Sequence, residues 1–314
     1  MSENKYIYPG PFRQRLQSLL PLLAVWLLLT TACSKKEEPV DNGKKLKLSF
    51  DCSSGSQADA IREIEVFVFD DQERLLGRTG TLVDGTIVLD YPQTSTLHCI
   101  AWGNSKDSDL EYSSLKPGDS LEKGYLTLKS LSPVRAGETF SNTPPDLFWG
   151  AIQIDNTLTT DNRQSLKMDM QPTTASIHIT IDGLPETTGT EDGDYAVVVS
   201  DPAGRIDFSD NYSGKTCHRL TGAFDTEKDY IIPAFRLFPT VGGEGLDFDV
   251  FHDGELLKSI TQTSDGKPII PVPGKELTLL IKFDAPSPPP STDGGLEVKP
   301  PAWEVTDVTV SVTK

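Results

Sequence analysis

Apolar and polar residues alternate over short runs along most of the chain, which is the period of β-strands. The first such run places Leu46, Leu48 and Phe50 on one face. The next, Ile64–Phe69, is apolar on both sides, as in a central buried strand. Clusters of Gly, Asn, Asp and Pro separate the runs and predict turns. Further strands are predicted at residues 86–89, 97–102, 125–128, 147–154 and 164–170.

The same pattern repeats after Met170, where Pro172 interrupts two strand-like runs. The best helical candidates are short, residues 58–63 and 109–115, and we interpret both as connections across the end of a sandwich. The pattern therefore predicts an all-β protein with a β-sandwich in each half. Strands of the second half are predicted at residues 177–181, 195–199, 230–238, 246–251 and 277–283.

The start of the chain has the order of a secretory signal. Arg13 and Arg15 precede an apolar run from Leu19 to Leu29, and Ala32 stands directly before Cys33. Ending the signal on cysteine is typical of lipoproteins, and the apolar run is shorter than the roughly 20 residues needed to span a bilayer. We predict that acyl chains on Cys33 hold the mature protein in a membrane. The alternative is an ordinary signal or membrane anchor beside a chance cysteine.

Changes in composition suggest the remaining boundaries. Residues 1–32 are the predicted signal peptide and the polar residues 33–45 a flexible tether. Residues 46–171 and 172–285 are the predicted sandwiches, and residues 286–295 form a Pro/Gly-rich linker. The segment 296–314 contains one more strand, in which Val308, Val310 and Val312 alternate with polar residues. This strand either completes its own sheet or pairs with the edge of another subunit by strand addition.

Charge and cysteine content restrict the chemistry. The net charge of −17 argues against a nucleic-acid partner, whose phosphates would repel the protein. With Cys33 lipidated, Cys52, Cys99 and Cys217 remain, so at least one is unpaired. We interpret Cys99 as a buried thiol in an apolar strand, and a Cys52–Cys99 disulfide is the main alternative. No CxxC pair is present, and we expect neither a metal nor a cofactor.

No pattern of nucleophile, base and acid is visible, and we predict that the protein is not an enzyme. Ser120 and Lys123 match Ser-x-x-Lys without its companion motifs. Asp247, Asp249 and Asp253 lack the spacing of a calcium loop, and we interpret them as an acidic strand followed by a hairpin turn. The scattered histidines, for which a satisfied or solvent-facing role is expected, are His98, His178, His218 and His252.

The tryptophans offer one alternative function. We interpret Trp102, Trp149 and Trp303 as core anchors, because aromatic residues within strands usually pack inside. They could instead provide stacking surfaces for sugars. A glycan-binding surface lipoprotein is therefore the alternative function.

Several segments of the chain match the pattern of one family. Residues 65–75 resemble a V-x-V-F-D-x-x-G-x-L hairpin, with Glu73 where glycine is common. The sequence of residues 171–181 resembles the opening of that family's second domain, with Gln171 near a frequent arginine. The other matching segments are Ile100–Asn104, Asp146–Gly150 and Arg236–Thr240. Together these segments resemble the FimB/Mfa-type fimbrial anchor lipoproteins of Bacteroidales.

The resemblance implies two tandem transthyretin-like β-sandwiches and no catalytic residues. It also implies a lipid anchor on Cys33 in the outer membrane, with the protein exposed at the surface as part of a fimbrium. The implied partners are fimbrial stalk subunits, the fimbrillins. We expect an anchor or accessory subunit that fastens a stalk to the cell by strand addition and so supports adhesion.

Overall fold

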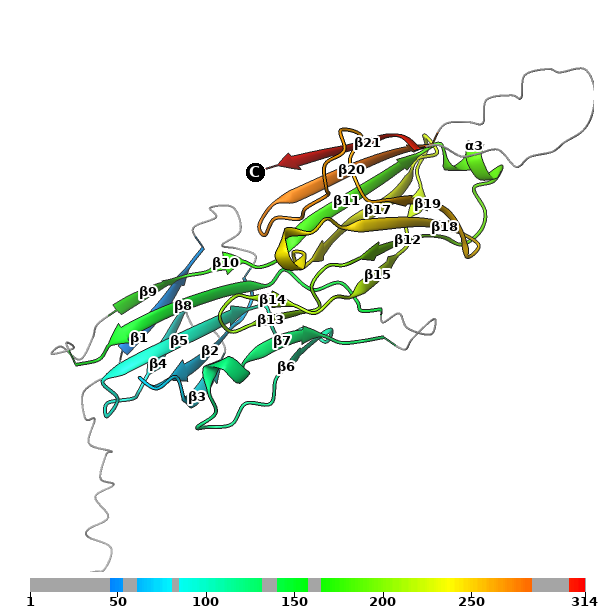
Figure 1. The fold of residues 1–314 in the computed structure, drawn as a ribbon. Helices are drawn as coiled ribbons and strands as arrows, with labels where there is room; N and C mark the ends of the chain where they lie inside the picture. The colour runs from blue at the N-terminus through cyan, green and yellow to red at the C-terminus, as the bar shows by residue number, and fades with distance from the viewer. Residues whose placement is uncertain are drawn as a thin grey trace, which may run out of the picture. The chain divides into compact units, whose positions relative to one another are not determined.

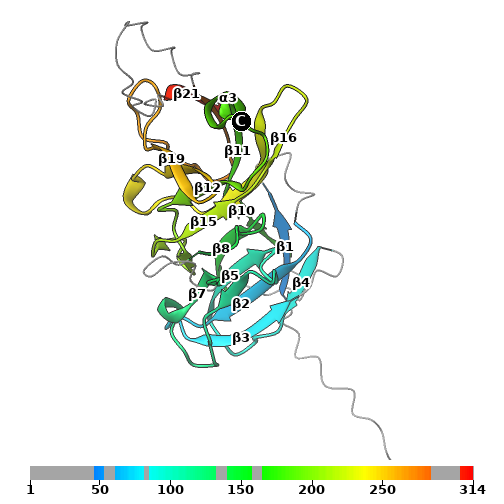
Figure 2. The ribbon, with the colours of Figure 1, turned by 90° about the vertical axis from the view of Figure 1, so that its right-hand side faces the viewer.

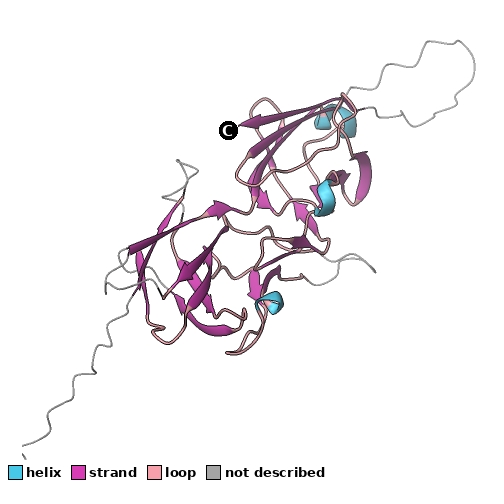
Figure 3. Ribbon diagram, turned by 60° about the vertical axis from the view of Figure 1, so that its left-hand side comes forward, coloured by secondary structure: helices cyan, strands magenta, loops and turns pink. Residues whose placement is uncertain are grey.

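The computed structural model describes residues 46–52, 61–80, 85–131, 140–157, 165–283 and 305–313, and nearly all regular structure within them is β-strand (Figures 1 and 3). The predicted all-β class is confirmed. The short helical elements are η2 (Leu121–Lys123), α3 (Leu184–Thr188) and η3 (Val241–Gly243). The strands are β1 (Leu46–Asp51), β2 (Ile64–Phe69), β3 (Leu75–Gly80), β4 (Thr86–Leu89), β5 (Thr96–Gly103), β6 (Leu110–Tyr112), β7 (Tyr125–Leu128), β8 (Phe148–Asp155), β9 (Ser165–Asp169), β10 (Gln171–Pro172), β11 (Ala175–Asp182), β12 (Tyr195–Ser200), β13 (Arg205–Asp207), β14 (Tyr212–Ser213), β15 (Cys217–Leu220), β16 (Ala223–Phe224), β17 (Tyr230–Leu237), β18 (Asp247–His252), β19 (Glu255–Ile260), β20 (Glu276–Phe283) and β21 (Val305–Thr313).

Two sheets pack face to face in the first half. One has the strand order β4-β1-β9 and the other β10-β8-β5-β2-β3. Their shared core contains Leu48, Val66, Cys99 and Met168. All six residues of β2 are buried, which explains why its sequence is apolar on both faces.

A third sheet, β14-β13-β7-β6, covers the other face of the sheet that contains β2 (Figure 1). Strands β13 and β14 follow β12 in sequence, yet β13 pairs with β7, with Ile206 opposite Leu126. The core beneath this sheet combines Phe67 and Trp102 with Phe208 and Phe238. We call residues 201–216 the crossing segment, because they leave the second half and complete a layer of the first.

The second half has two sheets of its own, β16-β17-β11-β20-β21 and β15-β12-β18-β19 (Figure 2). Their core contains Ile179, Val197, Phe248 and Leu279. Strand β21 pairs antiparallel with β20 of the same chain, from Glu276 opposite Thr313 to Phe283 opposite Val305. The last strand therefore completes a sheet of its own chain, which is one of the two roles considered for it.

The helix candidate at residues 109–115 is wrong. Residues Leu110–Tyr112 form β6, in which Leu110 lies opposite Leu128 of β7 and is buried. Pairing along β7 therefore determines the local structure. Of the other candidate, residues 61–63 have no regular structure and the rest lies outside the described residues.

The β2–β3 turn accounts for the unusual Glu73. This residue has φ 56°, a left-handed conformation that glycine adopts without strain. The Asp70 carboxylate accepts hydrogen bonds from the backbone N–H groups of Gln72 (2.9 Å) and Arg74 (2.8 Å). These bonds hold the turn and offset the cost of a side chain at position 73.

Replacing Phe208 by alanine should destabilise the whole protein. Phe208 is fully buried, so we expect Phe208→Ala to lower the free energy of unfolding by about 4 kcal/mol. Urea unfolding followed by circular dichroism measures the change. The control is Val88→Ala on β4, where the side chain is 51% exposed and a loss below about 0.5 kcal/mol is expected. Equal losses in both variants would contradict the role given to Phe208.

Candidate functional site

The predicted lipidation site Cys33 and the signal peptide lie outside the described residues, so both stay predictions. Within the described part of the chain, no helix is long and apolar enough to cross a membrane. The same residues contain no group of three or more His, Cys, Asp or Glu side chains placed to hold a metal ion. The candidate functional parts of the described chain are the junction between its halves and the edges of its sheets.

Segments that carry the family resemblance meet at the junction. Oδ2 of Asp146 lies 2.9 Å from Nη2 of Arg236 on β17. The backbone carbonyl of Asp146 also accepts a hydrogen bond from Nδ2 of Asn104, at 2.8 Å. Burial raises the pKa of Asp146, and the nearby Arg236 offsets only part of this effect. Three segments far apart in sequence therefore fix one another here.

Phe208 is the centre of the junction. Its ring centroid lies 4.7 Å from that of Phe67 and 5.9 Å from that of Trp102. The backbone carbonyl of Phe208 accepts a hydrogen bond of 3.2 Å from Nε1–H of Trp149. A Cβ atom at Gly124 would lie 2.5 Å from the Phe208 ring, so only glycine fits beside it. Both the ring and the backbone carbonyl of Phe208 therefore bind the crossing segment to the first half.

The tryptophans follow the core interpretation where they are described. Trp102 is fully buried, and Trp149 is half-buried against the same core. Trp303 lies outside the described residues. Trp102 therefore offers no surface on which a sugar could stack.

Asp210 is a titratable group in the crossing segment. Burial, and to a lesser extent the nearby Asp207, raise its pKa to about 6, a rise that the Tyr212 hydroxyl partly opposes. Asp210 Oδ1 has no hydrogen-bond partner among the described residues. Asp207 is used differently, because its carboxylate accepts the backbone N–H groups of Ser209 and Asn211 and closes the turn.

The three described cysteines are free thiols. Cys52 and Cys99 are buried in the same core cluster, and Cys217 is half-buried. Burial raises the pKa of Cys99 to about 12, so its thiol stays protonated and unreactive at neutral pH. The interpretation of Cys99 as a buried thiol is confirmed, and the structure does not contain the alternative Cys52–Cys99 disulfide.

All four histidines lie within strands. His98 and His178 are half-buried within β5 and β11. His218 is fully buried, which sequence reasoning did not anticipate, and its Nδ1 lies 2.8 Å from the backbone carbonyl of Ser141. His252 stacks on Tyr195 with ring centroids 4.3 Å apart.

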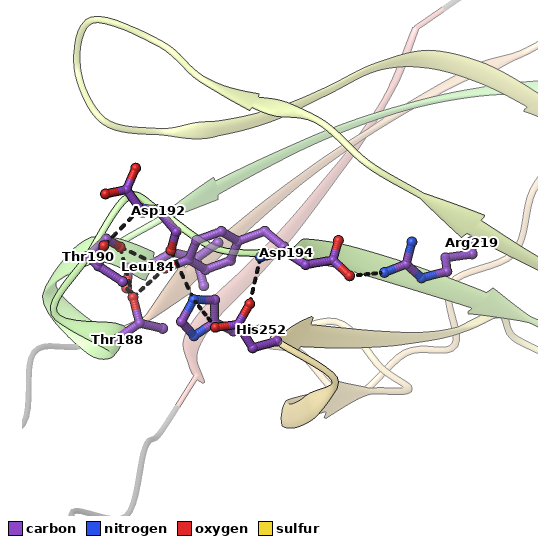
Figure 4. Close-up of polar contacts among 9 residues, drawn as sticks. Leu184, Thr188, Thr190, Asp192, Asp194, Arg219 and His252 are labelled. Atoms are coloured by element: carbon purple, nitrogen blue, oxygen red, sulfur yellow. Dashed lines mark hydrogen bonds and ion pairs between the residues drawn. The ribbon is translucent and has the colours of Figure 1, made fainter.

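The surroundings of His252 close one end of the second sandwich (Figure 4). Nε2 of His252 lies 3.1 Å from the backbone carbonyl of Asp192, and Asp194 forms an ion pair of 2.7 Å with Arg219. Burial raises the pKa of Tyr195, which keeps its hydroxyl protonated. These contacts join strands β12, β15 and β18 to the loop that precedes β12.

The other candidate chemistry is also structural. Nζ of Lys123 lies 2.8 Å from the carboxylate of Asp119, and Ser120 precedes η2. Asp247 and Asp249 lie on β18, and Asp253 with Gly254 forms the turn to β19. The interpretation as an acidic strand followed by a hairpin turn is confirmed.

Sheet edges in the second half differ in how they are protected. The two-residue β16 pairs with Tyr230 and Ile231 of β17, and beyond it the exposed Pro233 of β17 has no backbone donor. Strand β19 has a bulge in its pairing with β18. On the same strand Lys258 lies opposite the buried Val250, so a charged residue shares the face of the sheet that is turned to the core. On β15 the backbone carbonyl of Cys217 accepts a 2.9 Å hydrogen bond from the N–H of Ser141.

Strand β21 ends its sheet among the described strands and differs from these edges. Its nine residues contain no proline, and its pairing with β20 is regular as far as the shift between Lys282 and Phe283. A long, regular edge strand of this kind offers a row of backbone groups for another strand.

Comparison with known proteins agrees with this architecture. The model of a family described as fimbrillin-A associated anchor proteins Mfa1 and Mfa2 matches residues 33–309. The major fimbrium anchoring subunit FimB of Porphyromonas gingivalis W83 is 25% identical over 248 residues, which cover 72% of this chain and 76% of that protein.

Two solved structures share the fold. The fimbrial anchor protein Mfa2 of Porphyromonas gingivalis superposes with a TM-score of 0.60 at 12% identity, over 85% of this chain and 96% of that one. A Bacteroides thetaiotaomicron protein, described as a candidate polysaccharide-binding protein, gives a TM-score of 0.59 at 14% identity, over 86% and 98% of the two chains. At these identities the likeness concerns the fold alone.

The fold described above is that of an all-β protein built from packed sheets. The match over residues 33–309 then identifies the family: the chain belongs to the fimbrillin-associated anchor proteins. This family is one of structural fimbrial proteins, not of enzymes.

Removing the carboxylate of Asp210 should stabilise the protein above pH 6. The pKa is about 6 when folded, against an ordinary value of 3.8, so folding becomes less favourable as pH rises from about 4 to 6. We expect Asp210→Asn to raise the free energy of unfolding at pH 7.5 by about 1 kcal/mol, a figure reduced for partial exposure. The gain should disappear below pH 4.

Urea unfolding at pH 3.5, 5.5 and 7.5 measures this effect. Asparagine tolerates the positive φ of 63° at this position, so the backbone is preserved. Asp71→Asn in the exposed β2–β3 turn is the control for loss of one surface carboxylate. A stabilisation that does not depend on pH would contradict the explanation.

Proposed function

We propose that this protein is an outer-membrane lipoprotein that anchors a fimbrial stalk to the cell through lipid on Cys33. The family match carries the proposal, because it begins at residue 33 and extends over nearly all of the chain that follows. The relative FimB is itself described as an anchoring subunit of the major fimbrium. In this proposal the protein lies at the cell surface, and its partners are fimbrial stalk subunits.

In this proposal the stalk subunit is held by strand addition at the outer edge of β21, the strand that pairs with β20. Three other edges of the second half are obstructed by Pro233, by the bulge with Lys258, and by the bond from Ser141 to Cys217. Strand β21 remains as a nine-residue edge whose far side is unpaired among the described strands. A partner strand placed there would extend the sheet with backbone hydrogen bonds.

Glycan binding is the weaker candidate. It rested on the tryptophans, and Trp102 is inaccessible while Trp149 has its ring N–H bound to the Phe208 carbonyl. The polysaccharide-binding description of the Bacteroides thetaiotaomicron structure belongs to a protein that is 14% identical. No described contact favours a sugar.

Replacing Cys33 by alanine should release the protein and the fibres from the cell. Without the thiol no diacylglycerol can be attached, and anchoring is lost. Immunoblots of membrane and medium fractions measure the protein, and electron microscopy of the medium measures shed fibres. Ser34→Ala is the matched control and should stay in the membrane. An unchanged membrane fraction for Cys33→Ala would refute the anchoring proposal.

Deleting residues 305–314 should abolish retention of the stalk while leaving the protein in the membrane. The deletion removes the proposed edge but not the lipid. Co-purification of stalk subunits from solubilised membranes measures retention, and Leu256→Lys on the β19 edge is the control. Thermal unfolding of the deletion variant checks that it remains folded. Stalk retention at the wild-type level by a folded deletion variant would exclude β21 as the attachment edge.

A further inference from the structure

Strand β1 is the first described strand after the predicted tether, and it is held on both sides. It pairs antiparallel with β4 and parallel with β9. Leu46 and Leu48 point into the core with 2% and 0% exposure. Any pull on the N-terminal end of the chain therefore reaches the fold through a strand with two neighbours.

The direction of β1 determines how such a pull acts. At one end Lys47 lies opposite Ser165, and at the other Asp51 lies opposite Asp169. The backbone carbonyl of Asp51 accepts a 2.7 Å hydrogen bond from the N–H of Met170, the residue that leads into β10 and the second half. Leu46 is thus at the end of β1 away from the second half. A pull between Leu46 and the second half therefore acts along the strand.

The chain leaves β9 through β10 and enters β11, which is again one strand of a parallel pair. Strand β11 pairs parallel with β20, from Ser176 opposite Glu276 to Asp182 opposite Lys282. Strand β20 in turn pairs with β21. Among the named strands of the described chain, β1–β9 and β11–β20 are the parallel pairs, and they follow one another along the chain.

A parallel ladder resists tension along its strands differently from tension across them. Along the strands all its hydrogen bonds are strained together and must fail together. Across the strands they open one after another from the end. Each bond contributes only about 1 kcal/mol net, so loading them together rather than singly decides the strength of the ladder.

Side chains connect β1 to β9 in addition to the ladder. Oγ of Ser49 donates a hydrogen bond of 2.9 Å to the backbone carbonyl of Leu166. Lys167 forms an ion pair with Asp51, and this contact lowers the pKa of the Asp51 carboxyl. Both contacts would be strained by sliding of β1 along β9.

We propose that the β1–β9 and β11–β20 ladders form a tension path, in which force entering at the N-terminal end is carried in shear by two parallel ladders in series. The inference rests on the proposed anchoring function, which supplies the force between membrane and fibre. The ion pair of Asp146 with Arg236 and the Phe208 contacts hold the halves together, so that the ladders rather than the junction are strained.

Single-molecule pulling on the purified chain from residue 33 to 314 tests the proposal. With Cys33→Ser and Cys217→Ser in place, one protein carries handles at the N-terminal end and at Lys282→Cys, near the end of β20 that lies away from Ser176. A second carries them at the N-terminal end and at Ser165→Cys, an exposed position at the same end of the ladder as Lys47. We expect a rupture force severalfold higher in the first geometry, which shears the ladder, than in the second, which unzips it. Equal or reversed forces would overturn the proposal.

A matched pair of variants locates the resistance. Ser49→Ala combined with Lys167→Ala removes the side-chain links between β1 and β9. Lys123→Ala combined with Asp119→Ala removes an ion pair away from the path. Only the first should lower the rupture force in the geometry that shears the ladders, with thermal unfolding confirming that both are folded. Equal forces for the two variants would overturn the role of β1–β9.

These measurements are independent of the fibre. If shear and unzipping differ as expected but Cys33→Ala stays in the membrane, the ladders resist force and the anchoring proposal fails. If Cys33→Ala is released but the two geometries rupture at the same force, anchoring stands and the tension path is refuted.

Discussion

Phe208 packs against Phe67 and Trp102, although it lies beyond the boundary predicted at residue 171. The third layer of the first half depends on this contact, because β13 and Phe208 both come from the crossing segment. Without that segment, one face of β2 would expose large aromatic side chains to water. The first half therefore needs residues from the second to bury its core. The second half supplies them only once β12 and β15 have positioned the two ends of the segment.

This dependence makes the protein one mechanical and energetic unit. Contacts between residues 67 and 208 close a long loop, whose entropic cost is met only when the aromatic core forms. The Asp146–Arg236 ion pair and the Trp149–Phe208 hydrogen bond lie around the same core. Two sandwiches joined by a single strand crossing would be free to hinge. Here the chain crosses three times, once through β10 and then out and back through the crossing segment, and the Phe208 core lies at these connections.

Sequence periodicity predicted most strands, because burial of one or both faces leaves a direct mark, as in β2 and β11. It failed at β6, where three residues form a strand only because Leu128 of β7 is opposite Leu110. Phe208 could not have been placed, because Asp207–Asn211 has the composition of an exposed turn. Its partners are distant in sequence, and the close approach to Gly124 leaves no periodic signal. The partner of His218 could not be placed for the same reason, since Ser141 belongs to the other half.

The protected edges and the parallel ladders have a common consequence for attachment. Pro233, the β19 bulge and the Ser141–Cys217 bond each obstruct an edge at which strand pairing would otherwise be possible. In the proposed attachment, pairing is directed to β21, which is bound to β20, the strand parallel to β11. A strand added at that edge would be connected to β11 through the β21–β20 and β20–β11 ladders, to β9 through the covalent chain of β10, and to β1 through the β9–β1 ladder. Protection of the other edges would then do more than prevent aggregation, because it would leave β21 as the edge from which force reaches the N-terminal strand along the strand axes.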